Sequence, residues 1–194
     1  MTNPPPPYPL ETAQQEYLDF WASISPNVLP TLGIYVESMS LLRDVIVAAH
    51  AQAMGASMLA CRATIESACY TALSSVRIGP GGYRFDWPVD LSGKVRRVEF
   101  EEVKDGVASR GILPPDLLRQ VDEVQKHGNF IAHVATKNAA QLQKVVRFPK
   151  QGEGWRRMWV TVEEVRAALD CAKAVLRTLM EWSNSQPVQP LHQN

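Results

Sequence analysis

This sequence lacks the features of a membrane, disulfide-rich or strongly charged protein. No apolar run approaches the roughly 18 residues of a membrane-spanning helix, and the N-terminus has no charged segment leading into an apolar one, so we expect a cytoplasmic protein without a secretory signal. The cysteines are Cys61, Cys69 and Cys171. Without C-x-x-C spacing they indicate reduced thiols rather than a disulfide frame or a zinc site. Twenty Lys and Arg residues balance 20 Asp and Glu residues, which argues against a strongly basic, non-specific nucleic-acid binder.

Helical periodicity dominates the chain, and we expect an all-α, up-and-down helical bundle. The predicted helices cover residues 11–22, 35–49, 54–76, 98–109, 117–133 and 162–179. A turn is expected near 51–55, and a glycine-rich run stops the third helix before a loop at 83–93. Thr161 and Glu164 fit a capping box at the start of the last helix. Its apolar seam is predicted from Val162, Val165, Leu169, Ala172, Leu176 and Leu179.

We divide the chain into three parts. Residues 1–34 form a proline-rich arm and a short helix, 35–183 form the helical bundle, and 184–194 form a flexible tail. The proline tract reads as a solvated arm, with a docking arm for a partner as the alternative. A short β-hairpin is expected between the last two helices, within residues 147–160.

A basic segment precedes the last helix. Between residues 137 and 157, six Lys and Arg residues oppose one glutamate, a local charge of about +5. Trp155 and Trp159 flank Arg156 and Arg157. One interpretation is a solvated hairpin with its tryptophans packed on the bundle. The other is a substrate-binding patch in which the arginines contact phosphates and the aromatic rings stack on bases.

Chemically versatile residues concentrate in residues 125–133, QKHGNFIAH, at the end of a predicted helix. The apolar stripe of that helix comprises Leu117, Val121, Val124, Gly128 and Ile131. At about 100° per residue, Lys126, Asn129 and His133 fall on the other side, one turn apart. Phe130 lies beside them, and an exposed Phe there would indicate a partner surface. A cation, an amide and an imidazole thus line up on one side of the helix, which makes this stretch the candidate functional site of the chain.

The sequence contains ACRATIESA at residues 60–68 and GNFIAH at residues 128–133. These two pieces resemble the HEPN superfamily. The resemblance is strongest to a branch known only as a domain of unknown function, with an R-x-x-x-E helix and a G-N-x-x-A-H helix end. It covers Tyr35–Met180 and implies a HEPN-like bundle that dimerises side by side. In catalytic members, an Arg-x(4–6)-His motif from each protomer meets in a shared cleft and cuts RNA without a metal.

The resemblance also implies roles for individual residues. His133 is the motif histidine, which helps transfer the 2′-OH proton, and Asn129 is the internal polar residue. Lys126 stands where the motif has an arginine that stabilises the phosphorane. Lysine is cationic but lacks the planar, bidentate fork of arginine, which weakens the inference of activity. No cofactor or metal is expected.

Arg62 and Glu66 lie four residues apart on the third helix. One interpretation is a half-buried ion pair that locks helix packing. The other is that Arg62 reaches the His133 cleft, binds substrate and replaces the missing arginine.

Three other residues are interpreted as bystanders. His127 is expected to be a surface or loop contact, and His50 to be incidental. Cys171 is expected on the surface or at a dimer contact.

Two functions remain open at this point. The first is an RNA- or nucleotide-directed module, with metal-independent endoribonuclease activity at a homodimer cleft. The resemblance suggests a role in stress response or defence. The alternative is a non-catalytic HEPN-like module that dimerises and binds a partner protein in a larger system.

Overall fold

The computed structural model describes residues 10–86, 88–89, 94, 98–136 and 160–189. Within these residues the fold is mainly helical with one small antiparallel hairpin, which confirms the all-α bundle. The elements are α1 (Leu10–Ala22), the 3₁₀ helix η1 (Pro26–Tyr35), α2 (Val36–His50), α3 (Met54–Ser74), β1 (Ser75–Gly79), β2 (Gly82–Phe85), α4 (Phe100–Ser109), α5 (Pro115–Thr136) and α7 (Val162–Ser185). None of the described helices is long and apolar enough to cross a membrane.

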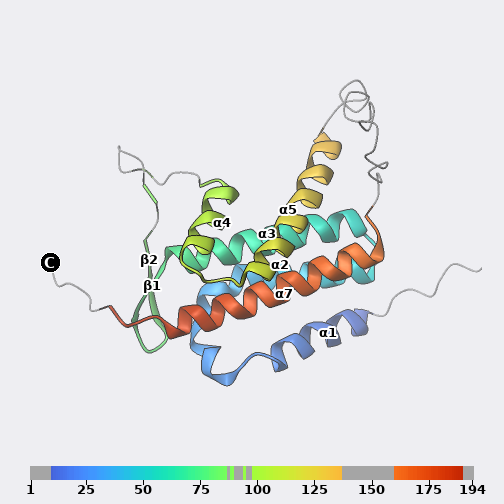
Figure 1. Cartoon of the computed structure of the whole chain (residues 1–194). Helices are drawn as coiled ribbons and strands as arrows, with labels where there is room; N and C mark the ends of the chain where they lie inside the picture. Colours follow the sequence, from blue (N-terminus) through green and yellow to red (C-terminus); the bar gives the residue numbers. More distant parts are fainter. Residues whose placement is uncertain (1–9, 87, 90–93, 95–97, 137–159, 190–194) are drawn as a thin grey trace, which may run out of the picture.

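Helix α3 is the centre of the bundle. It packs against α2, α4, α5 and α7, and α1 packs against α2. In Figure 1, α1 lies on one side of the α2, α3 and α7 group, while α4 and α5 lie on the other. Fully buried apolar side chains fill the space between these helices, among them Leu42, Ile46, Met58, Ile65 and Leu176. Helix α5 crosses the group steeply, and its last turns project beyond it (Figure 1).

Local chemistry explains the helix boundaries that were predicted. Gln52 adopts a positive φ of 57° in the turn between α2 and α3, which lets the chain reverse without a long linker. The α7 capping box is present: Glu164 N donates to Thr161 Oγ1 at 3.2 Å, and Thr161 N donates to Glu164 Oε2 at 2.8 Å. Pro115 begins α5, where the missing N–H costs nothing. Val162, predicted to start the α7 seam, is instead 53% exposed, because the buried stripe begins at Val165.

A hairpin occupies the region where the sequence predicted the end of a helix and a loop. Strands β1 and β2 pair Val76 with Arg84 around a turn in which Gly81 has a φ of +67°. The hairpin is held by the distant end of α7, because Arg77 Nη1 donates to Asn184 O at 2.6 Å, and Gln189 N donates to Arg77 O at 2.8 Å. The hairpin predicted within residues 147–160, before the last helix, lies outside the described residues except for Val160.

Candidate functional site

The motif stretch occupies the last turns of α5. Leu117, Val121 and Val124 are buried, which confirms the predicted core stripe. The Lys126 side chain is 59% exposed, and Asn129 is half-buried. Position 133 belongs to the same helix, one turn after Asn129; its side chain is outside what the structure describes. Phe130 was expected to be exposed but is half-buried.

Lys126 forms an ion pair on its own helix. Its Nζ donates to Glu123 Oε1 at 2.5 Å, and this hydrogen bond lowers the pKa of Glu123. Both side chains are well exposed, so the pair contributes little to stability. An anionic ligand can therefore replace Glu123 as the partner of Lys126 at little cost.

Arg62 packs directly on the motif helix. A Cβ built on Gly128 would lie 2.8 Å from Arg62 Cδ and 3.2 Å from Arg62 Cβ. The glycine therefore permits a close approach of α3 and α5. Arg62 Nη2 lies 4.0 Å from Glu66 Oε2, and the Arg62 side chain is 26% exposed. Its Nε is buried without a hydrogen-bond partner among the described residues.

The face of α5 that Arg62 contacts decides between its two interpretations. Gly128 belongs to the core stripe, and position 133 lies about 140° further around the helix axis. Within one chain, Arg62 thus approaches α5 from its inner side rather than from the side of Lys126 and Asn129. The geometry favours a packing role for Arg62.

We predict that Gly128→Ala destabilises the protein by about 1 kcal/mol. Alanine gains about 1 kcal/mol of helix propensity, but its Cβ would overlap the Arg62 stem, and overpacking typically costs about 1–3 kcal/mol. Urea unfolding of a double-mutant cycle measures the effect. In the Arg62→Ala background the same change should become neutral or stabilising. An equal cost in both backgrounds would contradict the proposed contact.

A polar network joins α4 to the start of the motif stretch. Gln125 is buried, and its Nε2 donates to Glu101 Oε1 at 2.5 Å. Lys104 Nζ lies 2.8 Å from Asp122 Oδ1 and 2.7 Å from Glu101 Oε2. Burial lowers the pKa of Lys104, but the hydrogen bonds to these two carboxylates outweigh it and raise the pKa. The network holds α5 in position one turn before Asn129.

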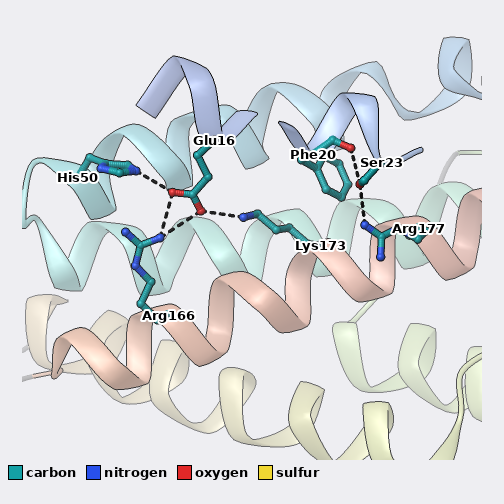
Figure 2. Close-up of polar contacts among 7 residues, drawn as sticks. All are labelled: Glu16, Phe20, Ser23, His50, Arg166, Lys173 and Arg177. Atoms are coloured by element: carbon teal, nitrogen blue, oxygen red, sulfur yellow. Dashed lines mark hydrogen bonds and ion pairs between the residues drawn. The ribbon is translucent and has the colours of Figure 1, made fainter. Parts of the chain in front are cut away.

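A second charged cluster was missed by the sequence analysis. Figure 2 shows Glu16 of α1 surrounded by His50 of α2 and by Arg166 and Lys173 of α7. Its Oε1 accepts from Lys173 Nζ at 2.7 Å, and its Oε2 lies 2.7 Å from His50 Nε2. Arg166 Nη1 donates to both carboxylate oxygens, at 3.1 and 3.0 Å. The expectation that His50 is incidental is wrong, because only 6% of this residue is exposed and it contacts Glu16.

The electrostatics of this cluster favour an ionised Glu16. Burial raises the pKa of the carboxyl group, but hydrogen bonds from Lys173, Arg166 and His50 outweigh burial and lower it to about 2. A second contact lies along the same helices: Arg177 Nη2 donates to Ser23 Oγ at 2.7 Å, and its guanidinium carbon lies 5.8 Å from the Phe20 ring centroid (Figure 2). These contacts fasten α1 to α7, which is a structural role.

The sequence did contain a signal for Glu16. It lies three residues after Ala13 and four before Phe20, and both of these are buried. A charge at that position falls within the apolar stripe of the helix, where it requires partners.

The cysteines do not form a reactive centre. Cys61, Cys69 and Cys171 are free and buried, and burial is the largest cause that raises the pKa of each thiol to about 12. The surface placement expected for Cys171 is wrong, because only 1% of the residue is exposed. Thiols with such a pKa are not nucleophiles at neutral pH.

Arg156 and Arg157 lie outside the described residues, so their substrate-binding role stays a prediction. Within the described ranges, no group of three or more His, Cys, Asp or Glu side chains could hold a metal ion. Comparisons of the chain with family models, curated proteins and solved structures found no match. The HEPN resemblance therefore rests on the two sequence pieces that carry it.

Proposed function

We propose that the chain is a cytoplasmic, HEPN-like, RNA-directed module that acts as a metal-independent endoribonuclease in a homodimer cleft. One observation carries this proposal. The last turns of α5 place Lys126 and Asn129 one turn apart and off the core stripe, with position 133 one turn further on. These turns project from the bundle, so a second copy can approach them (Figure 1).

The proposed reaction uses ordinary side-chain chemistry. His133 accepts the proton of an RNA 2′-OH as that oxygen bonds to phosphorus. The bond from phosphorus to the 5′ oxygen breaks, and this oxygen takes up a proton, leaving a 2′,3′-cyclic phosphate and a 5′-hydroxyl. A histidine, whose unperturbed pKa is about 6.5, suits both proton transfers near neutral pH. Lys126 offsets the charge that develops on the phosphorane oxygens.

The alternative is a non-catalytic HEPN-like module that dimerises and binds a partner in a larger system. One observation favours it. Arg62 is held against Gly128 on the inner side of α5. In this arrangement Arg62 does not replace the motif arginine within one chain.

We predict that Lys126→Arg retains or raises RNA cleavage, whereas Lys126→Met lowers it by about 10²-fold. Arginine keeps the charge and adds a bidentate fork for phosphate, and methionine keeps only the aliphatic bulk. The measurement is cleavage of a panel of end-labelled RNAs in EDTA, with the ends of the products identified. A strong loss in Lys126→Arg would show that the assigned role is wrong. Absence of cleavage by a folded wild-type dimer would favour the alternative function.

A further inference from the structure

A groove separates α5 from α7 on the surface of the bundle. It has a volume of about 710 Å³. The apolar residues Met58 of α3, Val124 of α5 and Ala168 of α7 are buried at its base. The groove is thus walled by two helices, and a third helix lies under it. This size and lining suit a set of apolar side chains from a bound segment.

The rim of the groove is acidic. Among the described lining residues, Asp116, Glu123, Glu164 and Asp170 carry carboxylates, and Arg119 alone carries a permanent positive charge. The acidic residues come from both walls, two from α5 and two from α7. An apolar base between two negative edges is a pattern that a basic amphipathic segment complements.

Pairing within the chain leaves the rim net negative, because its four carboxylates face two cations, Arg119 and Lys126. One of the carboxylates, Glu164, also accepts a hydrogen bond from Thr161 N in the capping box. Asp116 pairs with Arg119, and Glu123 pairs with Lys126, but all four side chains are largely exposed, so these ion pairs are weak. Asp170 forms no ion pair with any residue that the structure describes. The excess charge repels a phosphate backbone, so RNA is not the occupant that this face selects.

We propose that the groove docks a basic amphipathic α-helix of a partner protein. The apolar side of that helix would rest on Met58, Val124 and Ala168, and its Lys and Arg residues would reach the carboxylates of both walls. A helix fits because the two walls are themselves helices, whose side-chain ridges accept those of a third. This inference goes beyond the proposed function, since it requires neither RNA nor His133.

The test uses a fluorescent synthetic helix of leucine and lysine, with a leucine and glutamate helix of the same length and pattern as its control. Binding to the full chain is followed by fluorescence anisotropy. We expect the basic peptide to bind at least about tenfold more tightly than the acidic one, and its affinity to fall with salt. Equal binding of both peptides, or none by the basic one, would overturn the proposal. RNA takes no part in this binding measurement, so the groove proposal can stand even if the nuclease proposal fails.

Charge reversal locates the site. The double variant Glu123→Lys/Asp170→Lys should weaken binding of the basic peptide by about tenfold or more. The matched control is Glu37→Lys/Glu181→Lys, which makes the same charge change at exposed positions outside the groove lining. An equal loss in this control would show non-specific attraction and would overturn the proposal.

A steric variant and an oligomer measurement complete the test. Ala167 lines the groove and is exposed, so Ala167→Trp should block the peptide while preserving the fold. Full binding by a folded Ala167→Trp variant would place the peptide elsewhere. Sedimentation of the charge-reversal variant tests whether a second copy of the chain, rather than a partner helix, occupies the groove. A change in its oligomeric state would assign the groove to a second copy of the chain and overturn the partner helix.

Discussion

Replacing Glu16 with glutamine is expected to lower the free energy of unfolding by about 3 kcal/mol, since removing one member of a buried charge network leaves the others uncompensated. Lys173 and His50 are largely buried around this carboxylate, and Arg166 donates to both of its oxygens. Glutamine keeps the shape of the side chain but removes the charge. Urea unfolding at neutral pH measures the change.

The pH dependence of unfolding gives an independent readout of the same contact. The pKa of Glu16 is lowered from 4.5 to about 2 in the folded chain, so the unfolded chain takes up this proton first as the pH falls. The stabilisation is therefore fully present above about pH 4.5 and is lost as the pH falls toward about 2. The difference between wild type and Glu16→Gln should shrink over this window.

A matched variant on the same helix controls for the chemical change. Asp19 on α1 is exposed, and its carboxylate accepts a hydrogen bond from Gln15. Asp19→Asn should change stability by less than about 0.5 kcal/mol. If Glu16→Gln were as mild as Asp19→Asn, or if its effect did not depend on pH, the cluster would not fasten α1 as described.

Replacing His133 with alanine is expected to lower RNA cleavage by about 10²–10⁴-fold, the usual contribution of general acid–base catalysis. This expectation rests on the proposed function. The fold should be preserved, because position 133 lies on the side of α5 opposite its core stripe. Labelled RNA in EDTA gives the rates, and circular dichroism with sedimentation reports folding and assembly.

His127→Ala is the matched control for this experiment. The residue lies on the same helix, six positions earlier, but lines the groove between α5 and α7. The His127→Ala variant should cleave RNA at close to the wild-type rate. An equal loss in both variants, or unfolding of His133→Ala, would contradict the assignment. Cleavage that persists in His133→Ala would indicate either a contaminating nuclease or a different catalytic residue.

Much of the helical scaffold could be read from local sequence. The Thr161 capping box and Pro115 at the start of α5 depend on neighbours within one turn, so each acts wherever the helix is placed. The buried stripe of α5 follows from the helical period alone. The same period placed Lys126 and Asn129 together, away from that stripe.

Contacts between distant segments explain what the sequence analysis missed. Arg77 fastens the β1–β2 hairpin to Asn184 at the end of α7. The sequence around residue 77 does not predict this contact, because Asn184 lies 107 positions later. Cys171 was expected on the surface or at a dimer contact, but it is 1% exposed and lies close enough to Cys61 and Cys69 of α3 to contribute to their raised pKa values. Helix periodicity shows which side of a helix is apolar but not how many neighbours enclose it.

The sequence alone established the helical class, most helix boundaries and the spacing of the motif residues, because hydrogen bonds and side-chain periodicity within a helix are local. The three-dimensional packing established which charges meet. Glu16 is paired with His50, Arg166 and Lys173, which lie 34, 150 and 157 positions later in the sequence. Arg62 packs on Gly128, in a helix that begins more than 50 residues after Arg62. Burial makes such charges costly without partners, yet only the folded arrangement of α1, α2, α3, α5 and α7 identifies those partners.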